Sequence, residues 1–196
     1  EWVRLVEYGF FFILLGFELW ITRHRLPVAG EVPPTIEDRE RREKPTVAII
    51  IPVYNESSVI GEALKRFVSL GANEVIVADG RSTDGTYETV KKEFPTVMCY
   101  QTAFPERSLQ MNLGAFESKS DVFIFAHIDM RLPSNAIEMV REKVQKGFIG
   151  GGFKKSYNPS TWLLRAYIYL LNQLYLARMH CLVGTNAIFV TRKAFK

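Results

Sequence analysis

The chain contains few cysteines and few histidines, two and three respectively in 196 residues. Cys99 and Cys181 are far apart in the sequence and match no zinc-binding spacing. This argues against a disulfide framework and against a cysteine-based metal centre. Because both cysteines lie in apolar surroundings, we expect them to be structural thiols in a reducing compartment.

The chain also lacks a strong excess of one charge. Lys and Arg number 25 against 21 Asp and Glu, which gives a net charge of +4. A nucleic-acid-binding protein would concentrate Lys and Arg on one face, so we expect small anionic molecules or anionic lipid as partners, and no nucleic acid. Hydrophobic residues make up 47% of the chain, which excludes disorder for the chain as a whole. The length favours one domain with appendages.

No long hydrophobic run is free of charge. Residues 2–21 are strongly apolar with three charges near their ends, and as a helix they would extend about 30 Å, the hydrocarbon thickness of a bilayer. The uncharged part, residues 8–17, is only half as long, so a spanning helix, an interfacial helix and a helix packed on a soluble domain all stay open. We interpret residues 1–26 as a hydrophobic, membrane-seeking helix. Arg23 and Arg25 would then keep the later chain in the cytoplasm.

Residues 27–45 combine prolines with the mixed-charge run IEDRERREK, a composition that predicts a linker. A domain is expected at 46–196 and is expected to be incomplete at its C-terminal end. It opens with TVAIIIPVY (Thr46–Tyr54), a β-branched run typical of a strand buried on both faces. Further strands are predicted at 74–79, 96–100 and 121–129, and helices at 57–69, 84–93 and 107–118.

This alternation predicts an α/β fold with a mostly parallel, Rossmann-like sheet flanked by helices. Ligands of such sheets bind outside the carboxyl ends of the strands. The loop VADGRSTDGT (residues 77–86) leaves one strand end through Asp79. Its helix-start amides suit an anionic or hydroxylated ligand, although the same residues also make an ordinary strand-to-helix turn. A carboxylate there is costly to desolvate without donors, and a uracil imide or ribose hydroxyls would supply them.

A second polar group ends the strand in FIFAHIDM, where His127 and Asp129 would lie on one face if the strand continues. One carboxylate and a diphosphate suffice to bind Mg²⁺ or Mn²⁺. Such a metal would neutralise a leaving nucleoside diphosphate. In the alternative interpretation, Asp129 caps the following helix and His127 is a packed imidazole at the strand end.

In this order, the segments IPVYNE, DGRSTDGT and FAHIDMRLP resemble the family 2 glycosyltransferases, which adopt the GT-A fold. The stretch ERSLQMNLGAFESKSDVFIFAHIDMRLP and the later GTNAIFVTRKAF are similar to a bacterial subgroup. That subgroup has a Gln-Met-Asn-x-Gly-Ala helix start and a His-x-Asp in place of the usual Asp-x-Asp. The resemblance covers residues 47–195.

The resemblance implies roles for individual residues. Pro52, Tyr54 and Glu56 would border the nucleotide base and ribose. Asp79 would contact the base or ribose, and Asp129 would bind the metal.

Four more donor-site residues follow from the same resemblance. Arg107, Gln110 and Asn112 would lie at the mouth of a helix, with Arg107 able to reach a phosphate. A surface turn and helix cap is the alternative for these three. His127 replaces the first Asp of the usual motif, which implies that fewer carboxylates coordinate the metal than in most relatives. The general base of the family is expected beyond Lys196.

The expected function is therefore sugar transfer from a UDP- or GDP-linked donor, inverting and metal-assisted. Residues 161–178 predict a helix that is apolar nearly all round, either buried in the domain or docked on a membrane, and a lipid-linked acceptor is one hypothesis. A degenerate transferase acting as a membrane-complex subunit is an alternative. A nucleotidyltransferase is a second alternative, but it would need a Gly-rich basic loop where this chain has NESSVIG.

Overall fold

The structure is a computed structural model that describes residues 44–153, 169 and 187–195. The predicted N-terminal helix (1–26) lies outside the described residues. So do the linker, apart from its last two residues, and the apolar helix at 161–178, apart from residue 169. Within the described ranges no helix is both long enough and apolar enough to cross a bilayer.

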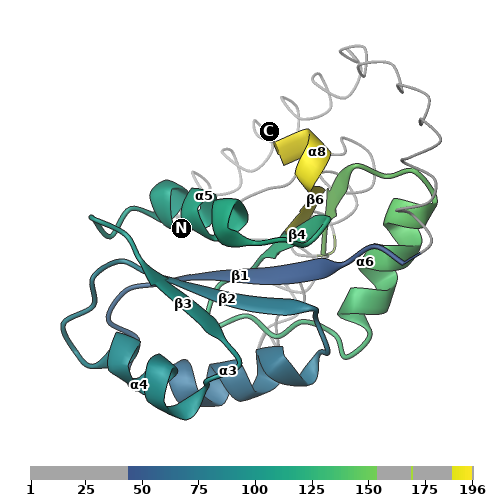
Figure 1. Ribbon diagram of the computed structural model, residues 1–196. Coiled ribbons are helices and arrows are strands. Elements are labelled where there is room, and N and C mark those ends of the chain that lie inside the picture. Colours follow the sequence, from purple (N-terminus) through teal and green to yellow (C-terminus); the bar gives the residue numbers. More distant parts are fainter. Residues whose placement is uncertain (1–43, 154–168, 170–186, 196) are drawn as a thin grey trace, which may run out of the picture.

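A mixed sheet forms the centre of the described domain, with the strand order β3-β2-β1-β4-β6-β5 (Figure 1). Neighbouring strands from β3 through β4 pair in parallel, whereas β6 pairs antiparallel with both β4 and β5. The predicted mostly parallel α/β sheet is thereby confirmed. The strands are β1 (Val47–Val53), β2 (Glu74–Asp79), β3 (Met98–Gln101), β4 (Val122–Phe125), β5 (Gly150–Gly152) and β6 (Ile188–Thr191).

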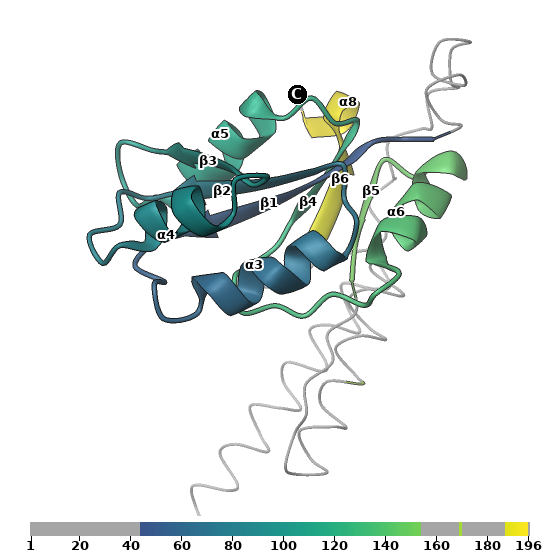
Figure 2. The ribbon, with the colours of Figure 1, turned by 60° about the horizontal axis from the view of Figure 1, so that its bottom comes forward.

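Helices cover both faces of this sheet. α3 and α4 lie on one face, and α5 and α8 lie on the other (Figure 1, Figure 2). The helices are α3 (Ile60–Ser69), α4 (Thr86–Glu93), α5 (Arg107–Glu117), α6 (Ala136–Gln145) and α8 (Arg192–Phe195). α6 follows β4 and packs its apolar side into the same core as α3.

The β1 strand is buried on both faces, as its β-branched run predicts. Ile49 and Ile51 join the core formed with α3, α4 and α6, whereas Ala48 and Ile50 join the core under α5. Successive side chains of a strand point to opposite faces, so one apolar run supplies both cores. The central strand is thus fixed from both sides, and its carboxyl end is held in place.

Candidate functional site

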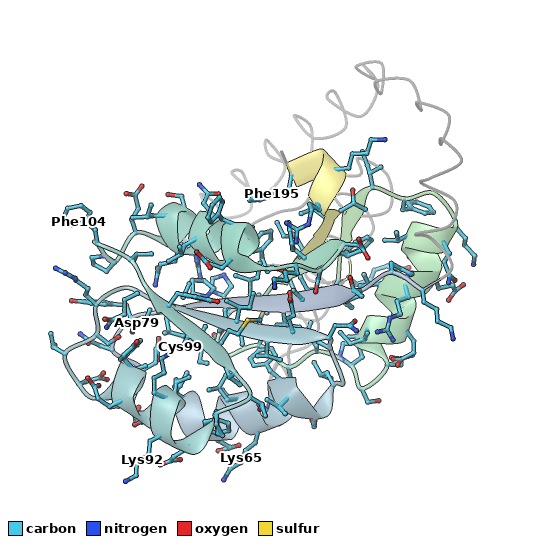
Figure 3. All side chains as sticks on the ribbon, viewed as in Figure 1. Lys65, Asp79, Lys92, Cys99, Phe104 and Phe195 are labelled. Atoms are coloured by element: carbon cyan, nitrogen blue, oxygen red, sulfur yellow. The ribbon has the colours of Figure 1, made fainter. Side chains whose placement is uncertain are left out.

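The carboxyl ends of β1, β2 and β4 meet at one edge of the sheet because the three strands are adjacent and parallel. Asp79, the last residue of β2, lies opposite Val53 at the end of β1. β4 lies on the other side of β1, and Asp129 follows its end. Strands two positions apart are separated by roughly 10 Å, so the two carboxylates leave the same edge on either side of β1. Figure 3 labels Asp79 at this end of the sheet.

Asp79 is completely buried, and its carboxylate accepts three hydrogen bonds from the chain. The Ser82 amide and the Gln101 side-chain amide donate to Oδ2 at 3.0 Å each, and the Ser82 hydroxyl donates to Oδ1 at 2.5 Å. These donors satisfy the buried charge. The expectation that a ligand must supply them is therefore wrong, while contact between Asp79 and a base remains a prediction.

The loop after β1 is bonded to the loop after β2. Three consecutive amides, those of Asn55, Glu56 and Ser57, donate to side-chain oxygens of the second loop at 2.8, 2.8 and 2.9 Å. The acceptors are the Ser82 hydroxyl, the Thr86 hydroxyl and the Asp84 carboxylate, in that order. One bond runs the other way, from the Thr83 amide to Asn55 Oδ1 at 2.9 Å. We call this set of bonds between residues 55–57 and 82–86 the inter-loop latch.

The latch changes the interpretation of the helix-start amides in residues 77–86. The amides of Ser82, Thr83 and Thr86 each donate to a protein side chain, those of Asp79, Asn55 and Asp84 respectively. These three amides are therefore not free to bind an anion, whereas anion binding by the other amides of this segment stays a prediction. The bonded amides form part of a wall beside the sheet edge.

Within the latch, the carboxyl group of Asp84 has a strongly lowered pKa. The Thr86 hydroxyl is the main cause, and the amides of Ser57 and Thr86 add to it, outweighing a partial desolvation that raises the pKa. Hydrogen bonds to the ionised form favour that form. The latch is therefore built on a charged Asp84 at neutral pH.

This lowered pKa predicts an acid dependence of stability. Because the folded-state pKa of Asp84 lies below its ordinary value of 3.8, its contribution to stability is present above that value and is lost as pH falls further. We expect Asp84→Asn to be less stable than the wild type at pH 7, and the difference to shrink on acidification. Urea unfolding of both proteins at several pH values between about 6 and 2.5 measures this. A difference that stays constant over this range contradicts the assignment.

The three predicted donor-site residues of α5 have different environments. Gln110 is 4% exposed and its amide nitrogen donates to the carbonyls of Val53 and Ala78 at 2.6 and 2.8 Å. Asn112, two residues on and about 200° around the helix, is exposed, as is Arg107 at the first turn. The structure therefore separates Gln110 from Asn112. Gln110 ties α5 to the ends of β1 and β2, and Arg107 remains the accessible cation.

His127 and Asp129 lie in a turn and not on a strand. β4 ends at Phe125, and the Met130 amide donates to the His127 carbonyl at 3.1 Å. The predicted strand to residue 129 is therefore wrong, and the two side chains do not share a strand face. Asp129 is exposed in the middle of the turn, whereas His127 is half-buried and its amide donates to the sulfur of Met130.

The donor set around Asp129 fits a divalent cation that is shared with a ligand. In the part of the chain that the structure describes, no three His, Cys, Asp or Glu side chains are grouped so that they could hold a metal. Mg²⁺ is commonly held by one or two carboxylates together with phosphate oxygens and water. An exposed single carboxylate at the site edge suits that mode, and it does not suit an all-protein metal cage.

The remaining predicted residues lie where β1 leaves the sheet. Pro52 is half-buried in β1, Tyr54 is 47% exposed directly after it, and Glu56 is half-buried at the start of the latch. Sequence reasoning missed Gln101, whose place in register with Asp79 at the end of the next strand was the available signal. It also missed Thr86, which the sequence shows only as one of several small polar residues.

A mostly parallel α/β sheet with acidic and polar groups gathered at its carboxyl edge is the architecture of nucleotide-binding α/β proteins. The family model "Glycosyl transferase family 2" matches residues 48–194. The chain belongs to this family. The predicted family is thereby confirmed, and the bacterial subgroup with its His-x-Asp motif stays a prediction.

Two curated relatives show how much of a whole protein this chain represents. The dolichol-phosphate mannosyltransferase of Pyrococcus furiosus is 28% identical over 125 residues, which cover 59% of this chain and 36% of the relative. The probable glycosyltransferase YdaM of Bacillus subtilis is 30% identical over 132 residues, 62% of this chain and 30% of the relative. The chain thus spans about a third of the length of these relatives.

Solved structures share the fold at low sequence identity. Mannosyl-3-phosphoglycerate synthase from Rubrobacter xylanophilus has a TM-score of 0.56 at 17% identity, covering 85% of this chain and 59% of that one. Glucosyl-3-phosphoglycerate synthase from Mycobacterium tuberculosis, in complex with Mn²⁺, UDP and glucosyl-3-phosphoglycerate, has a TM-score of 0.55 at 15% identity, with coverage of 86% and 65%. These similarities concern the fold alone.

Proposed function

We propose that the protein transfers a sugar from a UDP- or GDP-linked donor to an acceptor hydroxyl. The observation that carries this proposal is the common edge at which β2 and β4 place Asp79 and Asp129 on either side of β1, in a chain of glycosyl transferase family 2. Membership of that family also favours this reaction over the nucleotidyltransferase alternative.

The nucleoside part of the donor would lie against the wall formed by the latch. Pro52, Tyr54 and Glu56 would border the nucleoside there, and the exposed Tyr54 ring offers an apolar surface with a polar tip. UDP is present in the mycobacterial neighbour, so uridine is the first base to test. Asp79 orients Ser82 of this wall, and contact between its carboxylate and the base is part of the proposal.

The diphosphate would lie on the β4 side of the edge. Asp129 would hold Mg²⁺ or Mn²⁺ there, and Arg107 is an exposed cation that could contact a phosphate. A bound metal would withdraw negative charge from the leaving diphosphate. His127 would border this region as a neutral or charged imidazole, in place of a second acidic ligand.

The chemical step would be an inverting displacement. A carboxylate would take the proton of the acceptor hydroxyl as that oxygen attacks the anomeric carbon. The residues named above bind and orient the donor, and none of them is assigned as the base.

A membrane-associated acceptor is the finer part of the proposal. The apolar residues 2–21 would hold the protein at a membrane with the catalytic domain facing the cytoplasm. The relative from Pyrococcus furiosus is named for dolichol phosphate, which is a lipid. A lipid-linked acceptor agrees with both observations.

Nucleotide binding tests the proposed function. Isothermal titration of the chain with UDP and with GDP, each in the presence of Mn²⁺, is expected to show binding of one of the two nucleotides. CDP serves as the control nucleotide with a different base. Absence of binding by both UDP and GDP contradicts the donor-site assignment. The second candidate is a degenerate transferase subunit, which the single acidic ligand at Asp129 favours. In that case the full-length protein would show neither sugar transfer nor hydrolysis of the donor.

A further inference from the structure

We propose that the inter-loop latch is a positioning device for the donor, in which the hydroxyls of Ser82 and Thr86 fix the base- and ribose-binding wall before the donor arrives. This inference rests on the proposed function. It assigns a role to Thr86, Ser82 and Asn55, which lie behind the residues predicted to border the nucleoside. These three would not touch the reacting atoms and would act through Tyr54 and Glu56.

Each hydroxyl of the latch does two things at once. The Ser82 hydroxyl accepts from the Asn55 amide at 2.8 Å and donates to Asp79 at 2.5 Å. The Thr86 hydroxyl accepts from the Glu56 amide at 2.8 Å and donates to Asp84 at 2.6 Å. A hydroxyl is a small group that both donates and accepts. Each hydroxyl therefore links one carboxylate to one amide of the loop after β1, and the two amides are consecutive in the sequence.

The latch holds its loops in conformations that the backbone does not favour by itself. Asn55 has φ = 54° and Arg81 has φ = 63°, both in the left-handed region. Asparagine adopts this region more readily than other residues with a side chain, whereas arginine adopts it only where surrounding interactions determine it. The two left-handed residues lie on the two loops that the latch joins, so the latch bonds select one loop shape.

Such a fixed shape matters most for binding. A loop that must order when a ligand arrives weakens the affinity, and a loop that is already ordered does not. Tyr54 and Glu56 are predicted to border the nucleoside and are adjacent to, or part of, the latched segment. The hydroxyls of Ser82 and Thr86 bond amides of this segment, so their loss is expected to change the shape of the wall. Thr86 is also completely buried, so the test must separate its hydroxyl from its packing.

Two matched substitutions at the buried Thr86 separate this role from packing. Thr86→Val keeps the shape and removes the hydroxyl, whereas Thr86→Ser keeps the hydroxyl and removes a methyl group. Titration with UDP and Mn²⁺ is expected to show about tenfold weaker binding for Thr86→Val, and binding within about threefold of the wild type for Thr86→Ser. Melting temperatures of both variants give the packing effect separately.

A variant at an exposed position gives a second measurement that does not depend on the interior. Asn55→Gly keeps the amide and suits the left-handed backbone, and it removes only the acceptor for the Thr83 amide. It is expected to remain folded and to bind UDP several-fold more weakly. Equal UDP affinity for the wild type, Thr86→Val and Asn55→Gly overturns the positioning role, as does an equal loss in Thr86→Ser and Thr86→Val. If the wild type binds neither UDP nor GDP, the proposed function fails and this inference fails with it.

Discussion

Replacing Asp129 by asparagine is expected to lower sugar transfer by the full-length protein at least about 100-fold, which corresponds to about 2.7 kcal/mol of transition-state stabilisation. Asparagine keeps the size of the side chain and one oxygen, but it removes the negative charge that a hard divalent cation prefers. Asp129 is the exposed carboxylate of the turn after β4. We also expect Mn²⁺ to strengthen UDP binding in the wild type and to have little effect in Asp129→Asn.

The control for this substitution is Glu93→Gln, which removes the same charge from an exposed residue at the end of α4. Glu93 is the last residue of α4 and lies about two helical turns from Thr86, where the latch meets this helix. Its loss is expected to leave both transfer and the Mn²⁺ effect unchanged. Transfer by Asp129→Asn within about threefold of the wild type would remove Asp129 from the metal site.

Gly114→Ala is expected to destabilise the domain by about 2 kcal/mol and to lower its melting temperature by about 4–8 °C. Gly114 lies in α5 directly over β1, where an added Cβ would be 2.4 Å from Cγ2 of the fully buried Ile50. Alanine favours a helix over glycine by about 1 kcal/mol. Overpacking outweighs that gain here, because the methyl group meets a fully buried side chain of the central strand β1.

A glycine-to-alanine substitution in α3 is expected to change the free energy of unfolding in the opposite direction. An added Cβ at Gly61 would make only an ordinary van der Waals contact, at 4.0 Å from Glu93 Oε2, so Gly61→Ala is expected to stabilise by about 0.5–1 kcal/mol. Urea unfolding of both variants measures the two effects. A stabilising Gly114→Ala would mean that α5 does not approach β1 as closely as described, and it would weaken the anchoring of Gln110 at the sheet edge.

The sequence predicts the parallel strands well because their signal is local. The apolar run 46–54 becomes β1, and the run 74–79 becomes β2 with the same boundaries. β4 shows the limit of that signal. FIFAHID reads as one strand, but the strand ends at Phe125. Phe125 pairs with Ile50 as the last β4 residue in register with β1, and residues 127–130 then form a turn.

The polar residues of the site are predicted less completely, because their partners are distant in sequence. The composition of residues 77–86 indicates a ligand loop, yet it cannot show that three amides of that loop are bonded to side chains. Gln110 reads as a donor-site group, while in the structure it is buried against carbonyls 32 and 57 residues away in the sequence. Such bonds depend on how α5 is placed over the sheet.

The sequence by itself determined the family, the alternation of strands and helices, and the gathering of acidic residues after strand ends. These follow from apolar periodicity and from motif order, which need no knowledge of distant contacts. Only the tertiary structure decided which polar groups are already bonded within the chain and which stay accessible. Burial makes an unpaired polar group costly, so the packing of loops and α5 at the sheet edge left Asp79 and Gln110 bonded and Asp129 and Arg107 exposed.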